Sequence, residues 1–154
     1  EYSLFGRDIE DAILPAIRER GIGLVAYGVL SRGLISPQAT ASTGNAGIRG
    51  RRPRFHGENF VTNAKLVSAL QALAADLGLT LPQLAFAWVL SRGDDIVPLA
   101  GARNRTQLAD ILKAADVTLS PEALRRIEAV VPKGAVAGTR YGAEQMAHLD
   151  SETH

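Results

Sequence analysis

The sequence predicts an α/β protein in which apolar strands run parallel to one another and alternate with helices. Residues 22–27 and 95–99 are short apolar runs without the polar–apolar alternation of a half-buried strand, and this pattern is typical of parallel strands that are covered on both faces. Segments with helical periodicity lie between and around them, as the long crossovers of a parallel sheet require. With 154 residues, 46% of them hydrophobic, the chain is long enough to bury a core.

Composition excludes several classes of function. The 17 basic and 16 acidic residues leave a net charge of +1, which predicts no general attraction to nucleic acid or to a membrane surface. No apolar run approaches the roughly 20 residues of a spanning helix. The absence of cysteine excludes disulfides and thiolate metal sites and fits a cytoplasmic location. His56, His148 and His154 are too scattered to predict a metal site.

The first predicted helix covers residues 8–20. Asp8 is a candidate N-cap, and Gly21 is a candidate stop signal. Pro15 lies inside this segment, so we expect a kink or a tightened first half. The first strand follows and closes at Tyr27.

Residues 31–58 have no helical or strand periodicity and are predicted to form a long loop that contacts substrate and cofactor. The loop carries four arginines, at positions 49, 51, 52 and 54. Such a cluster can bind phosphate or RNA, but only Phe55 offers an aromatic stacking surface beside it. We therefore favour a solvated loop.

Two helices are predicted between the loop and the second strand. Apolar residues recur every three or four positions over residues 60–77, and Gly78 ends that segment. Thr80 is a candidate N-cap for the next helix, which has Pro82 in its first turn and extends to Gly93. This second helix is apolar on nearly all sides, which predicts deep burial.

The second strand, residues 95–99, precedes two further predicted helices. One covers about residues 105–115, and the other begins at Pro121 with Ser120 as its N-cap. The tail, residues 132–154, is predicted to be irregular.

Two strands cannot cover their own faces and edges. A (β/α)8 TIM barrel would provide the cover, but it takes about 250 residues. We therefore expect an incomplete barrel, completed by a missing half or by a partner chain. Residues 1–4 look like the end of a strand whose beginning is absent, which favours a fragment, although a native domain that has lost its initiator methionine is the alternative.

The carboxyl ends of the two strands are the expected ligand site, because barrels bind ligands there. Gly101 would allow close approach of the backbone, and Arg103 and Arg105 supply planar donors for a phosphate. The helix that starts there would present unpaired N–H groups to an anion. From the residues alone, an ordinary strand–helix turn is an equal alternative.

Five stretches, in order, resemble the C-terminal half of an aldo-keto reductase, and are most similar to the branch that includes pyridoxal reductase-like enzymes. They are EYSLFGRDIED, GIGLVAYGVLSRG, PRFHGENFVTN, PQLAFAWVLSRGDDIVPLAGARN and KGAVAGTRYGAEQMAHLD. The resemblance implies that residues 1–154 form the C-terminal half of the barrel.

The resemblance further implies an NADPH-dependent reductase of aldehydes or ketones. Nine residues would contact the cofactor: Tyr27, Gly28, Leu30, Arg32, Gly33, Gly101, Arg103, Gln107 and Asp110. Tyr27 would stack on the nicotinamide, the loop that begins at Gly28 would wrap the pyrophosphate, and the group that includes Arg103 would surround the 2′-phosphate. The family commonly has Ser, Pro and Gly where this chain has Gly28, Val29 and Ser31.

The tyrosine, lysine, aspartate and histidine of the family's catalytic set come from the first four strands, which have no counterpart here. We therefore assign no catalytic residue and expect the chain alone to be inactive. The expected partners are a small carbonyl compound and the missing half of the barrel. The alternative is a non-catalytic dinucleotide-binding or assembly module, in which two half-barrels close on each other as a homodimer.

Overall fold

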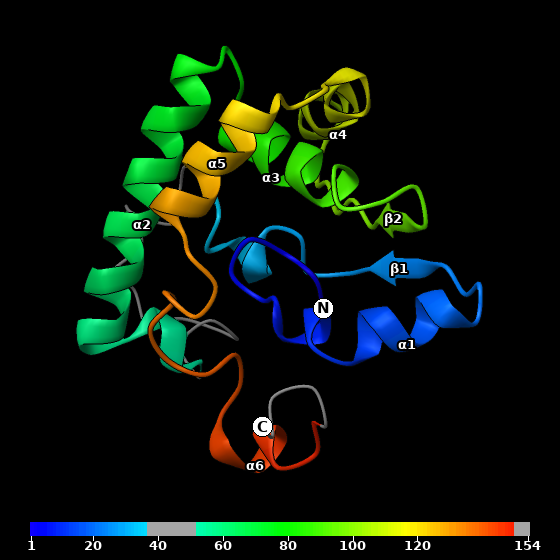
Figure 1. Cartoon of the computed structure of the whole chain (residues 1–154). Coiled ribbons are helices and arrows are strands. Elements are labelled where there is room, and N and C mark those ends of the chain that lie inside the picture. The colour runs from blue at the N-terminus through cyan, green and yellow to red at the C-terminus, as the bar shows by residue number, and fades with distance from the viewer. Residues whose placement is uncertain (37–51, 150–154) are drawn as a thin grey trace.

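The computed structural model describes residues 1–36 and 52–149 and contains two strands among helices (Figure 1). The strands are β1 (Leu24–Ala26) and β2 (Ile96–Pro98). The α-helices are α1 (Ile13–Glu19), α2 (Gly57–Asp76), α3 (Leu81–Leu90), α4 (Arg105–Leu112), α5 (Pro121–Val130) and α6 (Ala143–Met146). Shorter 3-10 turns are η1 (Asp8–Glu10), η2 (Ser31–Gly33), η4 (Pro53–Phe55) and η5 (Lys113–Asp116).

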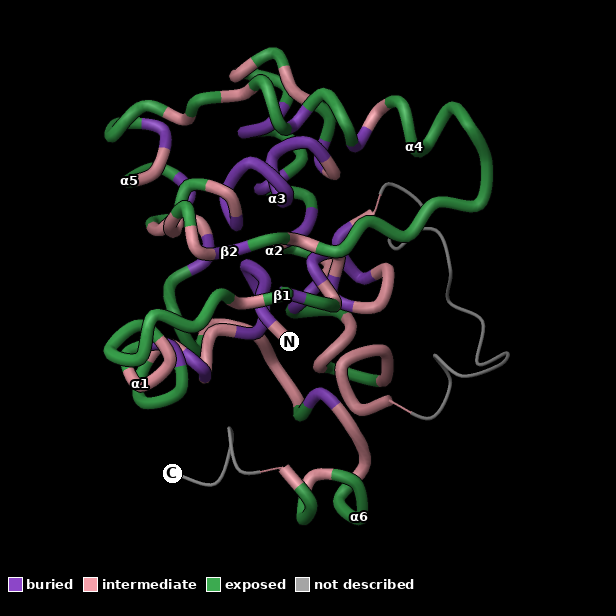
Figure 2. The backbone as a smooth tube through the Cα atoms, turned by 90° about the vertical axis from the view of Figure 1, so that its right-hand side faces the viewer, coloured by how far each residue is buried: buried purple, intermediate pink, exposed green. Residues whose placement is uncertain are grey.

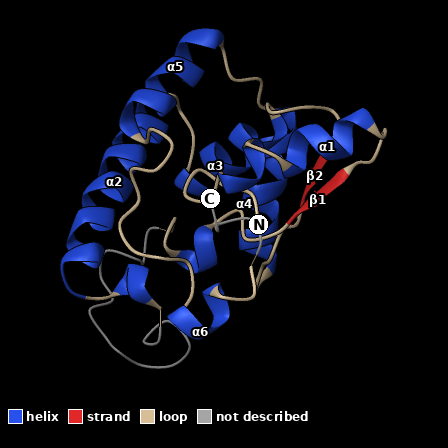
Figure 3. Ribbon diagram, turned by 60° about the horizontal axis from the view of Figure 1, so that its bottom comes forward, coloured by secondary structure: helices blue, strands red, loops and turns tan. Residues whose placement is uncertain are grey.

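The two strands pair in parallel, which confirms the predicted arrangement. Val25 lies opposite Val97 in the register. Hydrogen bonds extend the pairing at both ends, from Leu24 N to Asp95 O (2.7 Å) and from Leu99 N to Ala26 O (2.8 Å). The strands run side by side along one side of the molecule (Figure 3), and each is shorter than the apolar run that predicted it.

The described residues cover only one face of this sheet. Ala26 and Ile96 are 1% and 3% exposed, and α3 packs against β2. Val25 and Val97 point to the other face and are 60% and 59% exposed, and Figure 2 shows this part of both strands at the surface. Apolar side chains such as these valines are typical of a sheet face that another element covers, and no described residue covers this face.

Helix α3 is the centre of the core. Leu84, Trp88 and Val89 on it are fully buried. Its start is fixed as predicted, because the Thr80 hydroxyl accepts from Gln83 N at 3.2 Å and the Gln83 side chain accepts from Thr80 N at 3.1 Å. This capping box satisfies two backbone donors that the first turn leaves unpaired.

The predicted helix over residues 8–20 is divided into η1 and α1. The prediction that Asp8 is the N-cap is wrong, because Asp8 is the first residue of η1 and Arg7 occupies the cap position without a side-chain bond. Pro15 is tolerated because it lies in the first turn of α1. The tightened first half that we expected is present as η1, and Gly21 follows the helix with φ +65°.

The remaining helices follow the sequence closely, with three corrections. The predicted loop over residues 31–58 contains η2 and η4 and ends where α2 begins; its residues 37–51 lie outside the described residues. The predicted helix at residues 105–115 is α4 continued by η5, and Ser120 caps α5 as predicted. The tail is not wholly irregular, because it contains the short helix α6.

Within the described part of the chain, no single helix is both long and apolar enough to cross a membrane. Helices α2 and α3 satisfy that test only when taken together, and they meet at a bend of 86°.

Candidate functional site

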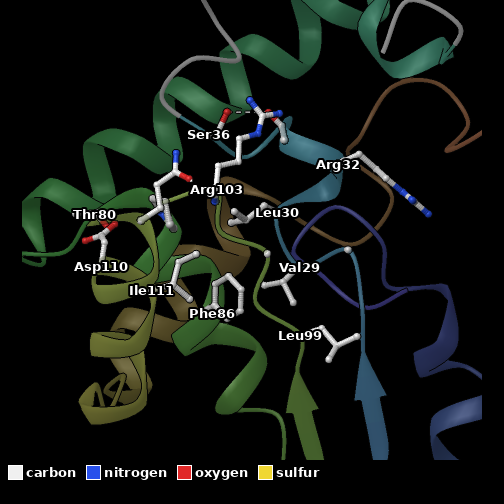
Figure 4. A pocket seen from close by; sticks show the side chains of 15 residues that line it. Val29, Leu30, Arg32, Ser36, Thr80, Phe86, Leu99, Arg103, Asp110 and Ile111 are labelled. Atoms are coloured by element: carbon white, nitrogen blue, oxygen red, sulfur yellow. Dashed lines mark hydrogen bonds between the residues drawn. The ribbon is translucent and has the colours of Figure 1, made fainter. Parts of the chain in front are cut away.

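A cavity of about 770 Å³ lies beyond the carboxyl ends of β1 and β2 (Figure 4). This volume is within the range of roughly 300–1,000 Å³ that is typical of small-molecule and cofactor sites. Its wall combines the loop after β1, the loop after β2 and the starts of α3 and α4. The lining residues are Gly28, Val29, Leu30, Arg32, Gly33, Ser36, Thr80, Pro82, Phe86, Leu99, Gly101, Arg103, Gln107, Asp110 and Ile111.

The structure brings together eight of the nine residues that the resemblance assigned to the cofactor. They are Gly28, Leu30, Arg32, Gly33, Gly101, Arg103, Gln107 and Asp110. The ninth, Tyr27, precedes them at the end of β1 and is 40% exposed, but it is not part of the cavity wall. Two segments that are about 70 positions apart in the sequence therefore share one cavity.

The loop after β1 follows an unusual backbone path. Gly28 and Gly33 have φ +71° and +88°, and the non-glycine residues Ser31 and Arg32 have φ +47° and +61°. Left-handed backbone at a residue with a side chain costs about 1–3 kcal/mol and is common at ligand sites. The path is held by the buried hydrogen bond between the Ser31 and Ser3 hydroxyls, 3.0 Å long.

Arg32 directs its guanidinium away from Arg103 and Ser36 (Figure 4). The guanidinium lies over the rings of Tyr27 and Tyr141, at 5.4 and 5.0 Å from their centroids, and donates a hydrogen bond to the Tyr141 hydroxyl. Arg32 can therefore contact a pyrophosphate in two ways. Either the guanidinium of Arg32 leaves Tyr141, or the backbone and aliphatic stem of Arg32 make the contact.

Tyr27 has a ring face occupied by that guanidinium, so a stacking ligand would use the other face. Burial raises the pKa of the Tyr27 hydroxyl, and the neighbouring Tyr141 raises it further. Tyr27 therefore stays neutral through the physiological range and can donate a hydrogen bond.

At the loop after β2, the start of α4 is already capped. The Asn104 side chain accepts from Gln107 N, and the Gln107 side chain accepts from Arg103 N, both at 2.9 Å. The expectation that this helix start presents its N–H groups to an anion is thus wrong for Gln107, because its N–H is already paired. The Arg103 guanidinium makes no hydrogen bond with the described residues, and it faces the cavity as a donor.

Asp110 joins α4 to the start of α3. Its carboxylate accepts from Gln83 Nε2 at 2.7 Å and from Thr80 Oγ1 at 3.0 Å. The carboxylate therefore holds the cavity wall together, and each oxygen keeps a lone pair for a ligand hydroxyl.

Sequence reasoning missed the part of the wall that comes from α3. Phe86 is only 3% exposed and looks like a core residue in an apolar helix, and Thr80 was interpreted only as a cap. No sequence signal separated Phe86 from its buried neighbours. For Thr80, the cap pattern indicated a helix start and gave no sign of the cavity.

The interpretation of the arginine cluster as a solvated loop is wrong for the two members that the structure describes. Arg52 and Arg54 are half-buried. Arg52 lies over the Tyr141 ring at 5.3 Å, and Arg54 donates to Gly138 O at 3.1 Å. Arg49 and Arg51 lie outside the described residues.

Fold and cavity together define a parallel α/β protein with a cavity at the carboxyl ends of its strands. A sequence model of the aldo/keto reductase family matches residues 1–132, and the chain therefore belongs to that family.

Known relatives agree with this assignment. The chain is 40% identical over 143 residues to a protein from Glycine max named probable aldo-keto reductase 1. The aligned region covers 92% of this chain and 41% of that protein. Among solved structures it is similar to the glycerol dehydrogenase of Gluconobacter oxydans, with a TM-score of 0.73, 26% identity, and coverage of 84% of this chain and 40% of that one. It is also similar to a thermostable aldo-keto reductase in complex with the inhibitor epalrestat, with a TM-score of 0.59, 25% identity, and coverage of 84% and 38%. The chain spans about two fifths of the length of these relatives.

Proposed function

We propose that this chain is the C-terminal, cofactor-binding part of an NADPH-dependent reductase of aldehydes or ketones, of the pyridoxal reductase-like branch. The observation that carries the proposal is the single cavity that joins the ends of β1 and β2. It collects eight residues that the family resemblance assigns to the cofactor.

The residues of the cavity fit a dinucleotide phosphate. Arg103 supplies a planar guanidinium, which is well matched to a 2′-phosphate. Phe86, Leu99 and Ile111 supply apolar surface for the adenosine. When bound, NADPH would supply the hydride for carbonyl reduction. The tyrosine that acts as proton donor in the family would come from the part of the barrel that precedes this chain, so the chain alone should not turn over carbonyl substrate.

Cofactor titrations test this function. We expect NADPH to bind the chain more tightly than NADH, and Arg103→Gln to weaken NADPH binding by about tenfold or more, since a charge-assisted contact is lost. NADH affinity should change little. The measurement is NADPH fluorescence or calorimetry, with Arg125→Gln on the exposed face of α5 as the matched control. Equal affinity for both cofactors in the wild type would contradict the choice of NADPH.

The bare face of the sheet favours a second function, that of a half-barrel that pairs with another copy. Val25 and Val97 on that face are apolar and exposed, and a second half-barrel would cover them. Sedimentation equilibrium distinguishes the two possibilities: a stable dimer supports the assembly module, and a folded monomer contradicts it.

A further inference from the structure

The loop after β1, residues 27–35, is attached to the start of the chain at two points (Figure 1). Where the loop begins, Tyr2 N donates to Tyr27 O at 3.2 Å. Further along, the hydroxyls of Ser3 and Ser31 form a hydrogen bond of 3.0 Å. These two serines, here called the serine pair, are 28 positions apart in the sequence and meet only in the folded chain.

Both members of the serine pair are buried. Ser3 is 0% exposed and Ser31 is 3% exposed. A buried hydroxyl costs free energy unless it forms a hydrogen bond, and the cost is largest when one partner of an existing bond is removed. Loss of either hydroxyl would therefore leave the other one buried without its partner in the pair.

Ser3 is held in place independently of the loop. Its backbone N–H donates to Gly6 O at 3.1 Å, and Gly6 N donates back to Ser3 O at 3.2 Å. The Ser3 hydroxyl also accepts from Phe5 N at 3.2 Å. The neighbouring side chains of Tyr2 and Leu4 are buried in the core. Ser3 is thus a fixed point to which the loop is attached.

Ser31, by contrast, lies in a stretch of unfavourable backbone. Ser31 has φ +47° and Arg32 has φ +61°, and residues with side chains keep such a conformation only where the surrounding structure holds it. Val29 and Leu34 are buried on the two sides of this stretch, so they anchor the loop without fixing the two left-handed residues between them. The Ser31 hydroxyl attaches the left-handed stretch itself to Ser3.

The path of this stretch determines the shape of the cavity wall. Gly28 and Leu30 line the cavity before Ser31, and Arg32 and Gly33 line it after Ser31. A change of φ at Ser31 would therefore move one half of the loop's wall relative to the other. Neither serine of the pair is among the lining residues, so the pair would act on the wall indirectly, through the loop.

We propose that Ser3 is a positioning residue for the dinucleotide: through the serine pair, it holds the loop after β1 in the conformation that binds the cofactor. The proposal rests on the proposed function. Without the pair, the loop would populate other conformations, and the apparent affinity would fall with the fraction of chains that can still bind. NADPH and NADH should be affected alike, because the pair acts on the shape of the wall and not on the 2′-phosphate.

Cofactor titrations of serine variants test the proposal. We expect Ser3→Ala to lower the affinities for NADPH and NADH by a similar factor, about threefold to tenfold, which corresponds to one hydrogen bond. Ser31→Ala should have a similar effect, and the double variant should bind about as well as either single variant, since the same bond is lost. The matched control is Ser91→Ala, which removes a hydrogen bond of 2.7 Å to Trp88 O outside the cavity wall and should leave both affinities unchanged.

A second measurement separates positioning from a general loss of stability. In NMR spectra of the chain without cofactor, the one-bond Cα–Hα coupling distinguishes positive from negative φ. We expect Ser3→Ala to shift this coupling at Ser31 toward the value of negative φ, and Ser91→Ala to leave it unchanged. Ser31→Gly also lacks the hydroxyl, but glycine adopts positive φ without strain. It should therefore bind both cofactors more tightly than Ser31→Ala.

The outcomes distinguish the role of Ser3 from the proposed function. An unchanged cofactor affinity, or an unchanged coupling at Ser31, in a folded Ser3→Ala variant would overturn the role of Ser3. If Ser3→Ala does not fold, Ser31→Ala removes the same bond from the loop, and wild-type affinity in that variant would overturn it. A wild-type chain that binds neither nucleotide would refute the proposed function, and the coupling would still show whether the serine pair holds the loop.

Discussion

At the scale of single residues, arginines pack over aromatic rings at two places in this protein, around Trp88 and around Tyr141. Around Trp88, Arg7 and Arg92 are neutralised by Glu10 and Glu128 and close the core. Burial raises the pKa of the Tyr2 hydroxyl in the same region, and its hydrogen bond to Glu10 raises it further. Around Tyr141, Arg32, Arg52 and Arg140 lie over the ring in a similar way.

Two glycines that line the cavity, Gly28 and Gly101, differ in whether their backbone requires glycine. Gly28 has φ +71°, and an added Cβ would lie 2.8 Å from the Glu1 side chain. Gly101 also lines the cavity but has open space around it. We expect Gly28→Ala to lower the free energy of unfolding by about 1–3 kcal/mol and Gly101→Ala to change it by less than about 0.5 kcal/mol. Urea denaturation measures both, and equal effects would contradict the strain at Gly28.

The ion pair between Arg18 and Asp95 predicts a dependence on pH. Arg18 donates to both carboxylate oxygens, at 2.7 and 2.9 Å, and this hydrogen bonding holds the pKa of Asp95 below its ordinary value. Because the folded-state pKa is lowered, the stabilisation is complete above the unfolded value of about 4 and is lost as the pH falls through the folded value.

We therefore expect Asp95→Asn to be less stable than the wild type at neutral pH, with the difference disappearing in acid. Thermal unfolding at a series of pH values measures it. Asp94→Asn changes the same charge without removing an ion pair to the described residues and serves as the control. A difference that persisted in strong acid would show that Asp95 acts through something other than its charge.

At the scale of elements, the start of α3 is a junction between the core and the cavity. Thr80 closes the capping box and also donates to Asp110 on α4. The same hydroxyl therefore fixes one helix and orients the next, and the two helices form adjacent parts of the cavity wall.

Replacement of Thr80 should affect both stability and the cavity. We expect Thr80→Ala to cost about 1 kcal/mol of unfolding free energy, because Gln83 N loses its cap, and to weaken NADPH binding, because Asp110 loses a partner. Thr80→Ser retains the hydroxyl and should behave like the wild type. Chemical denaturation and NADPH titration check the two effects, and a stable Ala variant would contradict the role of the cap.

At the scale of the whole molecule, the two faces of the sheet differ in burial. Within residues 1–36 and 52–149, helices cover one face of β1 and β2, whereas Val25 and Val97 form an exposed apolar face (Figure 2). Apolar strand surface and free strand edges favour pairing with further strands. Completion of a barrel, by the rest of a longer chain or by a second copy, accounts for both features.

A charge on the bare face should prevent that pairing. We expect Val97→Lys to lower self-association of this chain without lowering its stability, because Val97 is already 59% exposed. Val61→Lys, at a 55% exposed position on α2, is the matched control. Sedimentation velocity over a range of concentrations measures association, and unchanged association in Val97→Lys would show that this face does not mediate it.

Local signals in the sequence were sufficient to locate most elements. The Thr80–Pro82 and Ser120–Pro121 caps, the glycine stops at positions 21 and 78, and the two apolar strand runs all appear where they were expected. Each of these signals depends only on residues within one helical turn or one strand, so it predicts an element without knowledge of the tertiary structure. Asp8 failed as a cap because the tight η1 turn, not an α-helix, begins there.

By itself, the sequence also placed the candidate site at the two strand ends, and the resemblance selected nine residues, eight of which line one cavity. Only the tertiary structure decided that Phe86 and Thr80 belong to that wall, that Arg32 points toward Tyr141, and that Arg52 and Arg140 meet around the same ring. The physical reason is range: caps and strand patterns depend on neighbours along the chain, whereas a cavity wall and an arginine cluster form only when distant segments are packed together.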